Sequence, residues 1–136
     1  MTIEELTRAL GAEIQKHPAY IRLGIAKQNN DEDQELQDDI GKLNLIRIQY
    51  NTEQSKESDK DPQKLEKLNQ EFKTLYGKIM RNQNMTEYNA AKEAMDAVMD
   101  DITAILAMCV NGEDPQTCQP PQRGCSGSCS SCSGCH

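Results

Sequence analysis

Four cysteines near the C-terminus are the residues whose type and spacing most directly indicate chemistry. They form a C-x3-C-x2-C-x2-C run in which only Gly and Ser stand between the thiols: Cys125, Cys129, Cys132 and Cys135. Thiolates are ligands of zinc and of iron–sulfur clusters. Several sulfurs reach one centre only if the backbone bends sharply between them, and Gly permits such bends because it adopts positive φ readily. The run therefore predicts a thiolate metal site.

Two kinds of metal centre compete for this run. Structural zinc sites usually have two ligand pairs that a longer loop separates, and no such loop interrupts the run. Dense runs with two- and three-residue spacers are typical of iron–sulfur ligation, where the fourth Cys of a run can serve another cluster. The pattern favours an iron–sulfur cluster over zinc or another thiophilic metal, and it leaves a metal-free redox tail as a third interpretation.

The spacing leaves the ligand set open. In one arrangement the first three cysteines of the run supply three ligands, and the fourth comes from Cys135, Cys118 or another subunit. His136 is a further candidate ligand, although a terminal His is more often solvated. Cys109 follows the apolar pattern of a helix and is expected in the core, while His17 is expected in a turn.

The composition of the chain changes at Asn111-Gly112, a good stop for a helix. Residues 112–136 hold 4 Gly, 3 Pro, 5 Ser and 5 Cys, whereas residues 1–111 are charged, rich in Leu and Gln, and almost free of Pro. We therefore divide the chain into a helical domain, residues 1–111, and a flexible, Cys-rich, metal-binding tail, residues 112–136.

Length and charge limit the function of the chain. Its 136 residues suffice for one domain, and 15 basic against 22 acidic residues give a formal net charge of −7. The hydrophobic share is 36%, with no Trp and one Phe, so a large aromatic core is not expected. Nucleic-acid binding relies on a basic surface, so the acidic balance argues against direct contact with nucleic acid.

The sequence also bears on the compartment. Its N-terminal segment, Met-Thr-Ile-Glu-Glu, has neither the basic start nor the apolar run of a secretory signal. No stretch approaches the roughly 20 apolar residues that a membrane-spanning helix needs. We therefore expect a cytoplasmic protein without membrane insertion. Clustered cysteines in that compartment are more often metal-binding or redox-active than structural disulfides.

The sequence that precedes the tail predicts helices. Thr2 and Glu5 form a capping-box pattern, in which each side chain satisfies a backbone N–H of the other residue. Apolar residues recur at helical spacing after that point, and no strand alternation is present. We expect helices over 3–16, 19–28, 36–56, 62–81 and 85–110.

The breaks between these helices have recognisable signals. His17 precedes Pro18, and the residue before Pro avoids the α conformation. Residues 29–31 are Asn-Asn-Asp and predict a turn or a soft bend. Asp61 is placed to cap the N-terminus of the helix that begins with Pro62.

The last two helices carry apolar residues at alternating spacings of three and four, the pattern of helices that pack side by side. Only residues 82–84 separate them, so we expect a hairpin. The apolar stripe of the last helix is longer than helix 62–81 can cover, which predicts a homodimer or a hetero-oligomer with a related subunit. The expected interface residues are Tyr88, Ala91, Met95, Val98, Ile102 and Ile105. The predicted fold is all-α: an elongated helical bundle with a C-terminal helical hairpin, followed by an irregular Cys/Gly/Ser-rich tail.

Residues 2–110 resemble the YlbF/YmcA family of bacterial cytosolic regulators. The resemblance rests on an N-terminal helix, a break at His17-Pro18-Ala19-Tyr20, a long polar helix, and the terminal hairpin LEKLNQEFKTLYGKIMRNQNMTEYNAAKEAMDAVMDDITAILAMCVNG. The YlbF branch of this family also ends in a Cys-rich tail, which is similar in kind to residues 118–135.

The resemblance implies a role that spacing alone does not indicate. Family members form helical homo-oligomers and assemble with a YmcA-type paralogue and a YaaT-type protein into a complex that carries 4Fe–4S clusters. That complex associates with ribonuclease Y, affects mRNA processing, and is linked to competence, sporulation and biofilm formation. By position, this subunit would contribute the cluster ligands Cys125, Cys129, Cys132 and Cys135. The implied role is an adaptor without catalysis of its own.

Two other function classes compete with the adaptor. The tail alone would suit a metal-handling or redox protein, such as a zinc or iron–sulfur carrier. Radical enzymes also use a C-x3-C-x2-C motif, but they need an α/β barrel, and this sequence shows no strands to build one. With two His residues, one of them terminal, no Ser/His/Asp set is credible. Any role in RNA metabolism is therefore expected to run through a protein partner.

Overall fold

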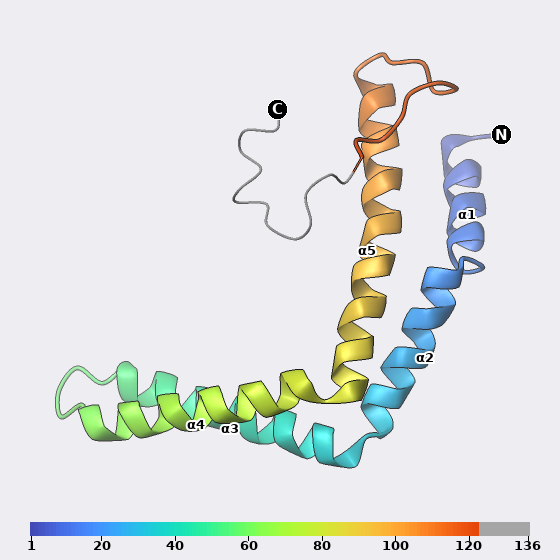
Figure 1. The fold of residues 1–136 in the computed structure, drawn as a ribbon. Helices are drawn as coiled ribbons and strands as arrows, with labels where there is room; N and C mark the ends of the chain where they lie inside the picture. The colour runs from blue at the N-terminus through green and yellow to red at the C-terminus, as the bar shows by residue number, and fades with distance from the viewer. Residues whose placement is uncertain (123–136) are drawn as a thin grey trace. The chain divides into compact units, whose positions relative to one another are not determined.

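The computed structural model describes residues 1–122, and helices are the regular elements within that range (Figure 1). The helices are α1 (Ile3–Ile14), α2 (Pro18–Glu32), α3 (Gln34–Gln54), α4 (Pro62–Arg81) and α5 (Gln83–Val110). No strand occurs in residues 1–122. The predicted all-α helical bundle is confirmed for this part of the chain.

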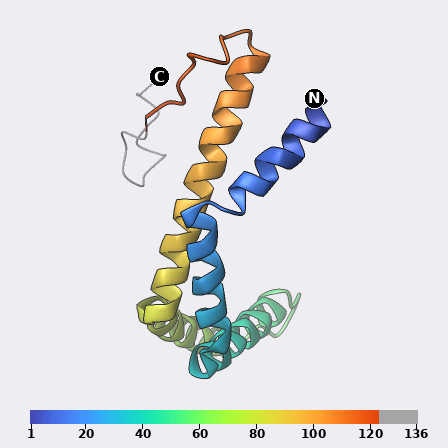
Figure 2. The ribbon, with the colours of Figure 1, turned by 90° about the vertical axis from the view of Figure 1, so that its right-hand side faces the viewer.

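The chain divides into two compact units, Met1–Met95 and a second that begins at Asp96. In the first unit the most extensive helix pair is α3 with α4, and α2 packs more lightly on α3. Figure 1 shows α3 and α4 side by side along most of their length, and Figure 2 shows the same helices after a turn of 90°. The buried apolar residues of this unit are Ala19, Ala26, Leu36, Leu68, Ile79 and Ala91.

The hairpin of the structure is formed by α3 and α4, so the predicted pairing of helices 62–81 and 85–110 is not the one formed. Residues 55–61 connect α3 to α4, with Asp59 in the left-handed region at φ 63°. That loop is long enough to return the chain along α3. Asn82 alone connects α4 to α5, and helical hairpins need about two to five connecting residues.

Several helix starts have the caps that the sequence predicts. The N–H of Thr2 donates to Glu5 Oε2 at 2.8 Å, and the N–H of Glu5 donates to Thr2 Oγ1 at 3.1 Å, which completes the capping box. The His17 Nδ1 accepts from the N–H of Ala19 at 3.0 Å, so His17 is the turn residue that was expected. Asp61 caps α4, with Pro62 in the first turn.

The predicted break at residues 29–31 is wrong, because α2 continues to Glu32. The chain bends instead at Asp33, which has extended backbone angles (φ −79°, ψ 94°). Asn30 is buried within α2 rather than exposed in a turn. Its side-chain amide contacts residues of other helices, which removes the reason to end the helix there.

The end of α5 follows the prediction. Gly112 adopts φ 92°, a conformation that favours Gly. The N–H of Gly112 donates to the carbonyl of Cys109 at 3.1 Å, and the N–H of Glu113 donates to the carbonyl of Met108 at 3.0 Å. These bonds satisfy carbonyls that the end of a helix leaves open. None of the helices in residues 1–122 is long and apolar enough to cross a membrane.

Candidate functional site

The predicted metal-binding run lies outside the described residues, and so does the terminal His. The residues concerned are Cys125, Cys129, Cys132, Cys135 and His136. Of the ligands considered from sequence, Cys118 is the one within residues 1–122. No group of three or more His, Cys, Asp or Glu in that range is placed to hold a metal ion. The ligand set therefore stays a prediction.

The two described cysteines, Cys109 and Cys118, lie near each other at the last turn of α5. Both are free thiols and both are half-buried, so Cys109 is less enclosed than the core position expected from sequence. The two side chains share a hydrogen bond. Burial raises the pKa of the Cys118 thiol, and the neighbouring Cys109 and Glu113 raise that pKa further.

A polar cluster, which we call the joint cluster, connects the α2–α3 break to the α4–α5 break. At its centre is Asp33, whose Oδ1 accepts from the N–H of Leu36 at 3.1 Å and caps α3. The other oxygen, Oδ2, accepts from the side-chain amides of Asn82 at 3.1 Å and Asn84 at 3.0 Å. The bond from the Leu36 N–H, followed by the two amide bonds, lowers the pKa of Asp33.

Further amides extend the joint cluster to α2 and α5. The Gln37 Nε2 donates to the carbonyl of Asn30 at 2.9 Å and to its Oδ1 at 3.0 Å. The Asn30 Nδ2 contacts the Met85 sulfur at 3.8 Å. Asn82 caps the start of α5, because its Oδ1 accepts from the N–H of Met85 at 3.0 Å. The cluster thus holds the two breaks of the first unit together.

Ion pairs connect the same helices. The Lys78 ammonium on α4 lies 2.8 Å from Asp39 and 3.1 Å from Glu35, both on α3. These carboxylates, Asp39 more than Glu35, raise the pKa of Lys78. The Arg22 guanidinium on α2 donates to both oxygens of Glu87 on α5, at 2.7 and 3.2 Å. Bidentate pairs of this kind fix the orientation of both partners.

The α3–α4 loop closes on a buried carboxylate. Glu53 is 1% exposed. Its oxygens lie 2.6 Å from the Lys56 ammonium and 3.8 Å from that of Lys64, and Oε1 accepts from the N–H of Asp61 at 2.9 Å. The hydrogen bond from Lys56 and then that from Asp61 lower the pKa of Glu53. Neither Glu53 nor the joint cluster is predicted from the sequence, although Asp33, three residues before Leu36, is a cap signal.

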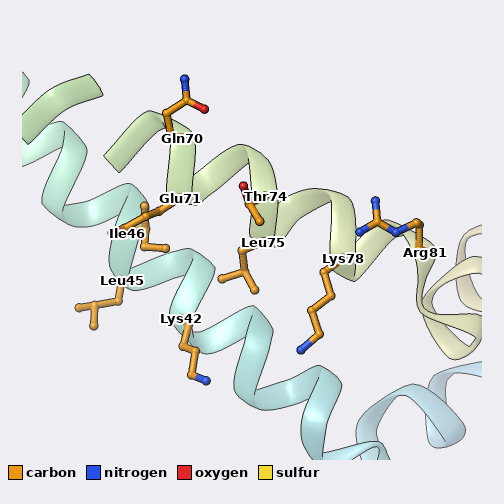
Figure 3. A pocket seen from close by; sticks show the side chains of 9 residues that line it. All are labelled: Lys42, Leu45, Ile46, Gln70, Glu71, Thr74, Leu75, Lys78 and Arg81. Atoms are coloured by element: carbon orange, nitrogen blue, oxygen red, sulfur yellow. The ribbon is translucent and has the colours of Figure 1, made fainter. Parts of the chain in front are cut away.

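An open groove of about 680 Å³ lies between α3 and α4. Figure 3 shows Ile46 and Leu75 between the two helices. The other lining residues are Lys42, Leu45, Gln70, Glu71, Thr74, Lys78 and Arg81. The lining contains no His, Cys or Ser, and Lys78 is paired with α3 carboxylates.

The predicted interface residues on α5 fall into two groups. Ala91 is fully buried within its own chain. The remaining five are half-buried: Tyr88, Met95, Val98, Ile102 and Ile105. Other large apolar side chains are exposed in the described part, among them Leu106 on α5 at 56% and Ile3 on α1 at 86%. Every residue of α1 is at least partly exposed.

The family model for control of competence regulator ComK, YlbF/YmcA, matches residues 3–111. The chain belongs to the YlbF/YmcA family. The match includes all of α1 to α5 and ends immediately after α5, so the joint cluster and the α3–α4 pair lie within the family domain. The comparisons with curated proteins and with solved structures give no match. YlbF/YmcA membership links the chain to control of ComK, a regulator of competence.

Proposed function

We propose that this YlbF/YmcA chain is a non-catalytic, cytoplasmic adaptor subunit of the YlbF type, which oligomerises through its helices and carries a metal cluster on its tail. The observation that carries the proposal is the imbalance between a small core and a large exposed apolar surface. Among residues 1–122, six apolar residues are buried, and three of them are Ala. Small cores are marginally stable, so assembly supplies burial that one chain lacks.

Exposed apolar residues occur on every described helix, and we propose that those of α1 and α5 are used for assembly. On α1 they are Ile3, Leu6 and Leu10; on α5, Met99, Leu106 and Val110 are exposed and five predicted interface residues are half-buried. A homodimer or higher homo-oligomer would cover such faces. A YmcA-type paralogue offers an alternative partner, because a related helical chain would present similar stripes.

The charged groups of the described part support an adaptor better than an enzyme. Asp33 and Glu53 accept hydrogen bonds from Asn82 and from the N–H of Asp61, and Asp39 forms an ion pair with Lys78. These carboxylates connect structural elements, which is a structural role. With a net charge of −7, contact with RNA is proposed to run through ribonuclease Y, and a YaaT-type protein completes the proposed assembly.

The donor chemistry of the tail suits an iron–sulfur cluster, which family resemblance makes a 4Fe–4S cluster. The proposed ligands are Cys125, Cys129, Cys132 and Cys135, with Cys118 and His136 as further candidates. Four closely spaced thiols with Gly and Ser between them match thiolate ligation, and zinc is the alternative.

The adaptor proposal is tested by assembly and by metal content. We expect anaerobically purified full-length chain to be brown, to contain iron and sulfide, and to form a stable oligomer in mass photometry. Leu106→Asp should shift the oligomer toward monomer, whereas the matched exposed substitution Lys92→Asp should not. Tagged chain should capture ribonuclease Y, and substitution of the four run cysteines by Ser should weaken capture. A stable monomer at micromolar concentration would contradict the proposed assembly.

The second candidate is a metal-handling or redox protein, which the density of thiols in the tail favours. If the protein handles metal, the cluster or the zinc should transfer rapidly to an apo-acceptor protein. If the protein is an adaptor, the metal should stay bound while the partners are captured. Stoichiometric zinc without iron would contradict the iron–sulfur assignment, yet it would leave the helical adaptor testable through partner capture.

A further inference from the structure

A second pair of thiols lies outside the C-x3-C-x2-C-x2-C run. Cys109 occupies the last turn of α5, and Cys118 lies in the segment that follows the helix. Both are half-buried free thiols, and their side chains are hydrogen-bonded to each other. Two neighbouring thiols are a potential dithiol site; neither belongs to the predicted metal run, and Cys118 is also a further candidate metal ligand.

Two successive turns bring Cys118 back to the end of α5. The first is the helix stop, where Gly112 at φ 92° donates to the Cys109 carbonyl at 3.1 Å. The second is built on Asp114, whose carbonyl accepts from the N–H of Thr117 at 3.2 Å and from that of Cys118 at 2.9 Å. The Asp114 Oδ1 also accepts from the N–H of Gln116 at 2.9 Å. Backbone hydrogen bonds therefore fix the position of Cys118.

We propose that Cys109 and Cys118 form a reversible disulfide that ties residues 113–118 to the last turn of α5. The oxidant is a low-molecular-weight disulfide, RSSR. One cysteine thiolate attacks RSSR and releases RS⁻, and the second thiolate then attacks the mixed disulfide and releases another RS⁻. One Cys109–Cys118 bond forms, the S–S bond of RSSR breaks, and the two cysteine protons end on two RSH. The cysteines lose two electrons and RSSR gains them.

The disulfide has a direct consequence for the tail. Cys118 cannot be bonded to Cys109 and serve as a metal ligand at the same time. Oxidation therefore removes Cys118 from the set of candidate ligands and connects the last turn of α5 to the segment that leads into the metal-binding run. The disulfide needs only Cys109 and Cys118, so it can form whether or not the four cysteines of the run bind a metal.

The proposed disulfide can be detected by peptide mapping, because trypsin separates the two groups of cysteines. Cleavage after Lys92 and Arg123 places Cys109 and Cys118 in peptide 93–123 and the four run cysteines in peptide 124–136. Full-length apo-protein is treated with oxidised glutathione, quenched with an alkylating reagent, digested and analysed by mass spectrometry. We expect peptide 93–123 to lose two hydrogen atoms and to resist alkylation until it is reduced.

Three controls make the assignment specific. Cys118→Ser should leave Cys109 as a persistent mixed disulfide with glutathione, whereas Cys132→Ser should leave the internal bond of peptide 93–123 unchanged. Oxidation in denaturant should scramble the pairing, because the two turns no longer hold Cys118. Recovery of Cys109 and Cys118 as alkylated thiols, or of peptide 93–123 cross-linked to peptide 124–136, would overturn the proposal.

Discussion

Helices α1 and α3 make opposite use of their apolar residues. The N-terminal helix α1 has a well-formed apolar stripe that includes Leu6 and Leu10, yet no residue of α1 is buried. In contrast, α3 shows little apolar periodicity but buries Leu36 completely, together with the carboxylates of Asp39 and Glu53. The helix with the stronger pattern is thus the one that contributes less to the interior.

An apolar stripe therefore does not by itself decide whether a helix is covered. A helix is buried where the chain brings a neighbour to it, and the loop 55–61 brings α4 back along α3. The polar groups on α3 are buried because Lys78, Lys56 and a backbone N–H are available as partners. We therefore expect substitutions in α3 to alter folding and substitutions in α1 to alter assembly.

The largest effect is expected for Leu36→Ala in α3. Leu36 is 1% exposed, and truncation of a buried Leu leaves a cavity that costs about 2–5 kcal/mol. Urea unfolding followed by circular dichroism should show this loss. Leu45→Ala on the same helix is the matched control: its side chain is exposed, so we expect a change below about 0.5 kcal/mol. Equal effects at the two positions would contradict the assigned burial.

A smaller loss of stability is expected for Asp33→Ala. The substitution removes the cap of α3 and leaves the amides of Asn82 and Asn84 without their shared acceptor. The melting temperature should fall less than in Leu36→Ala and more than in Asp31→Ala, where an exposed carboxylate is lost. Hydrogen exchange should localise the change to the two breaks. No difference between Asp33→Ala and Asp31→Ala would exclude a structural role for the joint cluster.

Acid should destabilise the first unit in part through Glu53 and Asp33. Hydrogen bonds lower the folded-state pKa of Glu53 and Asp33 below their ordinary values of 4.5 and 3.8. A lowered folded-state pKa stabilises the fold above the ordinary value, and this contribution is lost as pH falls through the lowered value. Unfolding free energy should therefore decline below about pH 4.5. Glu53→Gln should flatten that decline, whereas Glu57→Gln in the exposed loop should not.

The smallest effect on folding is expected for Leu6→Asp in α1. Leu6 is 51% exposed, so the unfolding free energy of the isolated chain should change by less than about 0.5 kcal/mol. Sedimentation should nevertheless show weaker self-association. Ala12→Asp, which introduces the same residue at an exposed position on the opposite side of the helix, should change both measurements less. A large drop in stability without a change in assembly would place α1 in the interior of its own chain.

The sequence predicted those features that depend on neighbouring residues. The capping box at Thr2, the turn at His17, the cap at Asp61 and the stop at Gly112 are all present. Each of these involves residues within a few positions of one another, so local propensity decides it. The predicted thiolate run is also local in sequence, and its ligands stay a prediction because they lie outside residues 1–122.

The sequence did not reveal contacts between distant segments. Asp33 bonds to amides 49 and 51 residues away, and nothing in the local pattern at Asn82 indicates that partner. The break predicted at residues 29–31 lies instead at Asp33, because Asn30 is hydrogen-bonded to Gln37 and contacts Met85 while it remains in the helix. The contact between Cys109 and Cys118 likewise depends on two turns acting together.

By itself, the sequence determined that the chain is helical, where most helices start, and that its thiols gather at one end. These properties follow from backbone propensity, capping and composition, which act over a few residues. Tertiary structure decided that α4 pairs with α3, that Glu53 and Asp39 are buried, and that Cys118 returns to Cys109. Those outcomes depend on which groups can satisfy one another once they leave water, and residues far apart in the chain supply the partners.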